Sequence, residues 1–347
     1  MHIDTKKMES DDEIQVFMPE TFEKNLNIEG DITEELQILV RERRICKLQL
    51  VTSMYGMGHK HSSVTRHVAN QIRKSTRILA NLLKWLDFTD VNISVTAQNL
   101  CEAFSYEMPS LTVLVLNEHF KYSKELICKI AYNCPNLRHI SLPNCDVAYD
   151  DVLLYFARKM QNLKVLRLDN PKPLTDDGFR NLCTHLVNLV ILDVTRSSIT
   201  DAGIEYIGNL KHLRELYLMC CDNITANCIN VLSHCGSRLQ ELNILSCGGI
   251  NPNEALHTIG LSGLPLTKIS LGFSDYIITN HKYHDTDYSL TDEGITSFLA
   301  GEGGKDLVDI YLHYGRGDVS IDALSQLFFK CKKLEWIAHK VTGDEKN

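Results

Sequence analysis

Short segments of the form L-x-x-L-x-L recur along the chain at nearly constant spacing. Four successive segments begin at Leu111, Leu137, Leu163 and Leu189, at intervals of 26 residues. After intervals of 24, 26, 27 and 41 residues, further segments begin at Leu213, Leu239, Leu266 and Leu307. One amphipathic helix or strand would not keep this phase, so the spacing favours a chain that stacks one structural unit many times.

Burial explains why the unit has this form. In each segment the first, fourth and sixth residues are apolar and point into a core, while the residues between them face solvent on a sheet. A helix then returns the chain to the start of the next strand, and each unit needs its neighbours to cover its apolar side. We therefore predict an α/β solenoid: a right-handed horseshoe with a parallel concave sheet and convex helices.

A second repeated phrase marks the predicted helix starts. It reads "LTDDGF" at Leu174, "ITDAGI" at Ile199 and "LTDEGI" at Leu290. The Thr and the following Asp can cap free amide groups at a helix N-terminus. The Gly two residues after each Asp allows a close approach to the neighbouring repeat. The phrase therefore predicts capped helices whose starts lie against one another.

Cysteine positions narrow the repeat type. Cys145, Cys221 and Cys247 each lie eight residues after the opening leucine of their segment, whereas Ser197 and Pro171 stand at the equivalent place. This pattern resembles the cysteine-containing leucine-rich-repeat proteins, which include F-box substrate receptors and antagonist-of-mitotic-exit proteins. The resemblance implies that the inward cysteine is a small apolar filler, which suits a free thiol. It also implies a role in ubiquitin-linked protein degradation.

The repeats divide the chain into two predicted regions. Residues 1–30 are acidic, and we expect them to be disordered. Residues 31–347 form the leucine-rich-repeat domain, with about 11 repeats if looser strands at Ile45 and Leu83 are included. Two insertions, near 51–78 and 275–289, interrupt the spacing. The later half of the first insertion predicts a helix with Ile72 on its apolar side.

The resemblance to F-box receptors implies a cullin-ligase linker subunit as one partner. "MPETFEKNL" at Met18 is similar to the start of an F-box, but the rest of that module has no counterpart before the first repeat. We therefore expect no complete F-box. Two functions remain open: substrate or adaptor recognition for an SCF-type ubiquitin ligase, and an F-box-less scaffold or regulatory inhibitor that binds a single protein.

Composition and motifs argue against other classes of function. The net charge of −8 argues against nucleic-acid binding, and no run of 18 apolar residues could span a membrane. No secretion signal is present, so we expect a cytoplasmic or nuclear protein with reduced thiols. No catalytic motif is present, and we expect no enzyme and no cofactor. We interpret the polar side chains of the insertions as loops rather than a metal site: His59, His61, His67, His281, His284, Asp285 and Asp287.

The predicted concave surface offers the remaining candidate site. The fifth and seventh places of each segment face outward, and stacking brings them into register on one sheet. Aromatic and apolar residues gather there towards the carboxyl end, as at protein interfaces. We predict that a monomer binds its protein partner through Arg167, Asp193, Tyr217, Met219, Leu245, Phe273, Tyr311, His313 and Tyr314.

Overall fold

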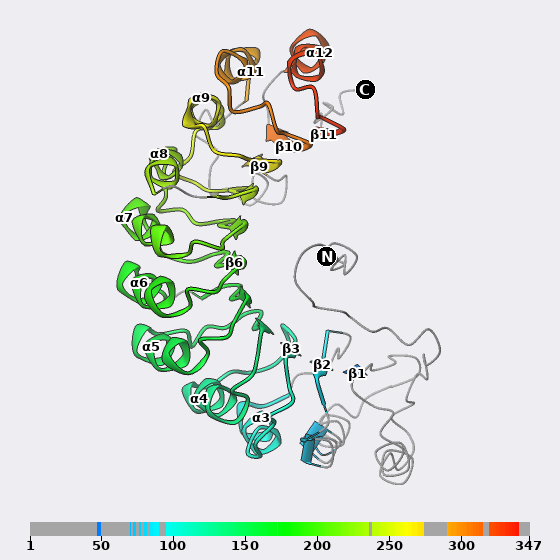
Figure 1. The fold of residues 1–347 in the computed structure, drawn as a ribbon, viewed down its shortest axis with the longest axis vertical. Helices are drawn as coiled ribbons and strands as arrows, with labels where there is room; N and C mark the ends of the chain where they lie inside the picture. Colours follow the sequence, from blue (N-terminus) through cyan, green and yellow to red (C-terminus); the bar gives the residue numbers. More distant parts are fainter. Residues whose placement is uncertain are drawn as a thin grey trace, which may run out of the picture.

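A single parallel sheet forms the concave side of the protein in a computed structural model (Figure 1). The structure describes residues 47–49, 70, 72–73, 76–77, 80–81, 83–89, 95–171, 173–235, 238–273, 290–314 and 319–339. Within them, 11 strands lie side by side in chain order. The strands are β1 Lys47–Gln49, β2 Trp85–Asp87, β3 Val113–Val115, β4 His139–Ser141, β5 Val165–Arg167, β6 Ile191–Asp193, β7 Glu215–Tyr217, β8 Glu241–Asn243, β9 Lys268–Phe273, β10 Asp309–Tyr314 and β11 Trp336–His339.

Helices follow the strands and form the convex side of the arc (Figure 1). They are α3 Ala97–Ala103, α4 Lys124–Asn133, α5 Asp150–Lys159, α6 Asp176–His185, α7 Asp201–Ile204 with the 3-10 helix η2 Glu205–Asn209, α8 Asn227–His234, α9 Pro252–Ser262, α11 Asp292–Leu299 and α12 Ile321–Lys330. The parallel sheet, the alternation with helices and the horseshoe arc confirm the predicted leucine-rich-repeat solenoid. The looser strands predicted near Ile45 and Leu83 are present as β1 and β2.

The core runs between the two layers as a continuous apolar spine. Leu189, Leu192 and Val194, the first, fourth and sixth residues of one segment, are all fully buried. Burying such a side chain contributes about 1.5–3 kcal/mol relative to exposing it. The predicted inward places of the repeat are therefore confirmed.

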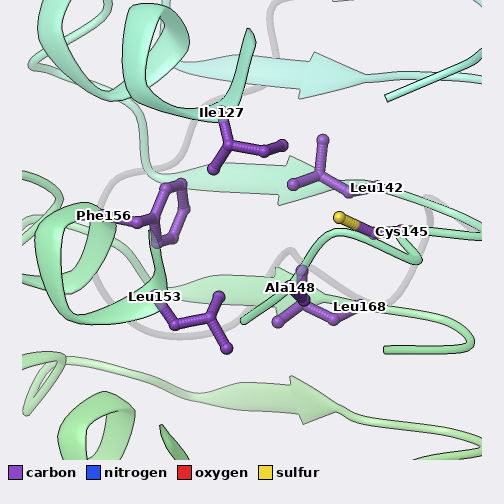
Figure 2. Close-up of a pocket in the computed structure, with 7 residues that line it drawn as sticks. All are labelled: Ile127, Leu142, Cys145, Ala148, Leu153, Phe156 and Leu168. Carbon is purple, nitrogen blue, oxygen red and sulfur yellow. The ribbon is translucent and has the colours of Figure 1, made fainter. Parts of the chain in front are cut away.

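Within one repeat, the interior closes almost completely. Figure 2 shows side chains of α4 and α5, with Phe156 and Ile127 among them, facing Cys145 and Leu168 from the strand side. The space that they surround has no room for a water molecule and is lined by apolar groups. It is a packing gap of the core rather than a ligand pocket.

The repeated Thr and Asp residues join successive helix starts. In α6, the amide of Thr175 donates to Asp150 Oδ1 at 3.2 Å and its hydroxyl donates to Asp150 Oδ2 at 2.6 Å. The same two hydrogen bonds join Thr200 to Asp176 at 2.8 and 2.6 Å, and Thr225 to Asp201 at 2.9 and 2.6 Å. We call these three Asp–Thr contacts the helix-start ladder. Each Asp belongs to one repeat and each Thr to the next.

The glycines of the repeated phrase make room for the ladder. A Cβ added at Gly203 would collide with the carboxylate of Asp176, and one added at Gly178 would collide with that of Asp150. A residue with a side chain would therefore displace the carboxylate that accepts the two hydrogen bonds. The predicted close approach between repeats is confirmed.

The cysteines of the repeat do more than fill space. Cys145, Cys221 and Cys247 are buried, as predicted. In addition, Cys247 Sγ donates to the carbonyl of Leu218 at 3.0 Å, and Cys221 Sγ donates to that of Val194 at 3.5 Å. A thiol at this place thus satisfies a strand-end carbonyl of the preceding repeat.

Several sequence predictions fall wholly or partly on residues outside the described ones. Residues 1–30, the 275–289 insertion and all of its candidate metal ligands are outside them. In the first insertion, the described residues from 70 to 77 are helical, with Ile72 buried and Arg73 exposed. None of the described helices is long and apolar enough to cross a lipid bilayer.

Candidate functional site: the concave face

Strand register decides which side chains meet on the concave face. Parallel pairing sets Glu215 beside Glu241, Glu241 beside Lys268 and Lys268 beside Asp309, so equal places of successive segments form rows across the sheet. The fifth-place row contains Ser141, Arg167, Asp193, Tyr217, Asn243, Ser270 and Tyr311. The third-place row contains Trp85, Val113, His139, Val165, Ile191, Glu215, Glu241, Lys268, Asp309 and Trp336.

The third-place row was missed when only the fifth and seventh places were considered. The signal was available, because the third place precedes the buried fourth and alternation along a strand turns it outward. The residues of the row are mostly apolar from β3 to β6 and charged from β7 to β10. We call its β3–β6 part, Val113, His139, Val165 and Ile191, the apolar half, and its β7–β10 part, Glu215, Glu241, Lys268 and Asp309, the charged half.

Arg167 connects three strands at the boundary between the halves. Its guanidinium Nη1 lies 3.3 Å from Asp193 Oδ2 on β6, and its Cζ lies 5.0 Å from the centre of the Tyr217 ring on β7. Both partners of the ion pair are largely shielded, with side chains 24% and 16% exposed. The arginine is therefore held across the face by one carboxylate and one aromatic ring.

Tyr217 lies between two carboxylates. Its hydroxyl is 2.9 Å from Glu215 Oε2 and 2.9 Å from Glu241 Oε1, and it has one proton to donate. Burial raises the pKa of Tyr217, and the charges of Glu215 and Glu241 raise it further. The phenol therefore stays protonated and keeps the two acidic side chains together on the sheet.

Lys268 extends this network to β10. Its ammonium group lies 2.9 Å from Glu241 Oε1 and 5.5 Å from the centre of the Tyr311 ring. Burial alone would lower the pKa of Lys268, but the hydrogen bond and charge of Glu241 raise it overall. A connected series of charged and aromatic groups thus runs across six strands, from Arg167 on β5 to Tyr311 on β10.

His139 is the one titratable group of the apolar half. Burial, followed by the charge of Arg167, lowers its pKa to about 4, so the imidazole is neutral at physiological pH. Its Nε2 is buried and has no hydrogen-bond partner among the described residues. Neighbouring Val113 and Val165 offer only apolar surface to the ring.

The structure corrects part of the predicted site. Tyr217 and Phe273 were predicted to be exposed but are only 9% and 4% exposed. Tyr217 is covered by its contacts with neighbouring strands, whereas Phe273 is buried at the end of the six-residue strand β9, after Gly272 with its φ of 98°. Arg167, Asp193, Met219, Leu245 and Tyr311 are half-buried. The side chains of His313 and Tyr314, whose backbones belong to β10, lie outside the described ones.

The described residues show little sign of a metal site or of a reactive cysteine. The described residues contain no group of three or more His, Cys, Asp and Glu side chains that could hold a metal ion. Burial raises the pKa of Cys145 to about 12 and that of Cys221 to about 11, which keeps both thiols protonated and unreactive. What the concave face offers is shape, charge and aromatic surface.

The fold is a leucine-rich-repeat solenoid in which Cys145, Cys221 and Cys247 are buried at one recurring place of the repeat. No protein-family model matches the chain. Part of it is similar to antagonist of mitotic exit network protein 1 of Candida glabrata, with 29% identity over 133 residues, 33% of this chain and 26% of that protein. It is also similar to F-box/LRR-repeat protein 17 of Arabidopsis thaliana, with 28% identity over 117 residues, 33% of this chain and 19% of that protein. These relatives confirm the resemblance to F-box/LRR and antagonist-of-mitotic-exit proteins.

Other similarities cover shorter segments or the fold alone. Mouse mitochondrial ATP synthase subunit s is 32% identical over 68 residues, 19% of this chain and 34% of that protein. The chain thus spans about a third or less of the length of these curated relatives. A chain of the yeast Rad7–Elc1 crystal structure is 18% identical with a TM-score of 0.47, covering 88% of this chain and 75% of its own length. A chain of the TLR13–ssRNA13 complex is 14% identical with a TM-score of 0.44, covering 75% and 36%.

Proposed function

We propose that the chain is a non-catalytic protein-binding module that recognises a substrate or adaptor for SCF-type ubiquitin ligase-dependent degradation. The observation that carries the proposal is the connected charged and aromatic series on the concave sheet, formed on a scaffold whose sequence is related to F-box/LRR proteins. Because parallel strands fix the spacing of these side chains, the face is a rigid template for another polypeptide.

The proposed binding residues keep the predicted set and add the third-place row. Arg167, Asp193 and Tyr217 hold one another at the centre of the face, while Met219, Leu245 and Tyr311 remain partly accessible around them. Phe273 is almost fully buried at the end of β9, and His313 and Tyr314 stay in the proposal as predicted from the sequence. The protein acts as a monomer in the cytoplasm or nucleus.

A regulatory role without ligase recruitment is the second candidate. It is favoured by the similarity to a protein named as an antagonist of the mitotic exit network. In this version the chain occupies one protein partner and blocks others from binding it. The two candidates share the concave face and differ in what happens to the bound protein.

Affinity capture from cells with the proteasome blocked, followed by mass spectrometry, tests the first candidate. We expect a cullin-ligase linker subunit together with a second protein whose half-life shortens when the chain is overproduced. The second candidate predicts the same second protein with an unchanged half-life and no ligase subunit. Capture that is equal for the protein and for a concave variant, Arg167→Glu with Lys268→Glu, would contradict both, because each depends on this face.

A further inference from the structure

The charged half of the concave face has more negative than positive charge. Glu215, Glu241 and Asp309 provide three carboxylates on β7, β8 and β10, and Lys268 on β9 provides one ammonium group. Lys268 is engaged by Glu241 at 2.9 Å. Among the described residues, neither Glu215 nor Asp309 forms an ion pair, and the one ammonium group beside Asp309, that of Lys268, is bonded to Glu241.

Glu215 also has a local reason to attract a donor. The hydroxyl of Tyr217 has one proton for two oxygens at 2.9 Å, Glu215 Oε2 and Glu241 Oε1, and only Glu241 Oε1 also has the Lys268 ammonium group within 2.9 Å. When the phenol donates to Glu241, its oxygen and the Glu215 carboxylate face each other as two acceptors. A cationic donor next to Glu215 removes this repulsion.

Trp336 supplies an independent feature beside Asp309. It is the third-place residue of β11, pairs in register with Asp309 and is 56% exposed. The half-buried Tyr311 lies on the neighbouring strand in the fifth-place row. An exposed indole beside a carboxylate suits an arginine or lysine, because the cation binds the ring face and the carboxylate together. Tryptophan is also enriched among residues that dominate protein interfaces.

The strand order sets the distance between these two positions. Glu215 on β7 and Asp309 on β10 are three strand spacings apart, about 14 Å. Side chains four residues apart in an extended segment are about 13 Å apart and point the same way. Glu241 and Lys268 lie between the two positions and pair with each other, so that part of the row offers a further cation no unpaired carboxylate.

We infer, resting on the proposed function, that the partner presents an extended basic segment to the charged half, with two Lys or Arg side chains four residues apart. One pairs with Glu215, and the other lies against Trp336 and pairs with Asp309. The residue midway between them faces the Glu241–Lys268 pair and is neutral. Phosphate-rich ligands do not fit, because the face would repel them.

Selection from a displayed library of random dodecapeptides on the purified full chain tests this inference. We expect the selected peptides to be enriched in Lys or Arg pairs at a spacing of four. The same selection on Glu215→Gln with Asp309→Asn is expected to lose that enrichment. For a synthetic selected peptide, we expect affinity to fall at least about tenfold with Trp336→Ala and a few fold with Asp309→Asn. Glu205→Gln, an exposed acid on η2, is the matched control and should leave affinity unchanged.

The possible outcomes separate this inference from the proposed function. Selected peptides without basic enrichment, or with affinity unaffected by both Asp309→Asn and Trp336→Ala, would overturn the inference and leave a peptide-binding face intact. Recovery of no binding peptides on the unmodified chain would count against the proposed function and the inference together. The Glu215 and Asp309 amide variants keep the test open even if Trp336→Ala fails to fold.

Discussion

The helix-start ladder and the concave face are made by the same repeats but obey different rules. On the ladder, Thr175, Thr200 and Thr225 each donate the same two hydrogen bonds to an Asp of the preceding repeat. On the concave face, equal places hold Ile191 in one repeat and Glu215 in the next. Because the ladder joins each repeat to the next across the same distance, the same residue types and hydrogen bonds recur in it. The outward side chains of the concave face are not required for this joining of helix starts, so their residue types can differ from repeat to repeat.

Together with the proposed function, this contrast places stability at the inner and helix-start positions and recognition at the outward strand positions. Adjacent residues of one strand can then have opposite roles. Leu192 is fully buried in the spine, whereas Ile191 and Asp193 on either side of it face the concave surface. Substitutions at single positions test this division, and their expected effects on stability decrease from the buried spine to the helix starts.

The largest loss is expected for Leu192→Ala. The substitution leaves a cavity in the spine and should lower the free energy of unfolding by about 2–5 kcal/mol in urea denaturation. The neighbouring Ile191→Ala removes a half-buried concave side chain and should cost about 1 kcal/mol or less. Equal losses for the two variants would mean that spine and concave places are not distinguished by burial.

The second effect is a pH dependence that comes from His139. Its pKa is about 4 in the folded protein and near 6.5 when unfolded, so the unfolded chain binds more protons between these values. Stability present above pH 6.5 should fall by up to about 3 kcal/mol as the pH drops to 4.

His139→Leu should remove that part of the pH dependence, as measured by urea denaturation at a series of pH values. His212→Leu, which changes an exposed histidine, is the control and should leave the profile unchanged. A profile for His139→Leu identical to that of the unmodified protein would show that the imidazole is solvated in the folded state.

The third effect, that of Gly203→Ala on stability, should depend on whether Asp176 is present. Gly203→Ala places a methyl group against the carboxylate of Asp176 and should cost about 1–3 kcal/mol. In an Asp176→Ala background the obstacle is absent, and the same change should be neutral or stabilising by up to about 1 kcal/mol, because Ala is the better helix former. A double-mutant cycle of unfolding free energies measures this coupling. Additive effects would contradict the close approach.

The smallest effect is expected for Thr200→Val. The change removes the hydroxyl that caps the amide of Ala202 and donates to Asp176, at a cost of about 0.5–2 kcal/mol. Thr184→Val is the matched control, since that hydroxyl donates only to the carbonyl of Arg180 within its own exposed helix turn. It should stay within about 0.5 kcal/mol of the unmodified protein. Thermal unfolding of the two variants side by side decides the comparison.

Most of the fold could be predicted from the sequence because every repeat buries apolar residues at the same places against its neighbours. The leucine spacing predicted β3 to β10, and the Thr-Asp-x-Gly phrase predicted the helix starts together with the room that Gly178 and Gly203 leave for the ladder. The burial of Cys145, Cys221 and Cys247 followed from their constant place in the repeat. Such positions are fixed by contacts between identical units.

The concave face was harder to predict because its contacts join different residues of different repeats. Tyr217 is buried since Glu215 and Glu241 accept from its hydroxyl and Arg167 lies over its ring from two strands away. No single segment encodes that arrangement. Phe273 is buried at the end of β9, which is six residues long rather than three, a length that the repeat pattern does not give.

The proposed function places recognition at the outward positions of the repeat array and stability at the inward and helix-start positions. The most direct measurement gives both the affinity for a selected basic peptide and the free energy of unfolding for two variants, Asp309→Asn and Thr200→Val. The account predicts that Asp309→Asn weakens binding and leaves stability within about 0.5 kcal/mol, while Thr200→Val lowers stability and leaves the affinity of the folded protein unchanged. Loss of both properties in each variant would contradict it.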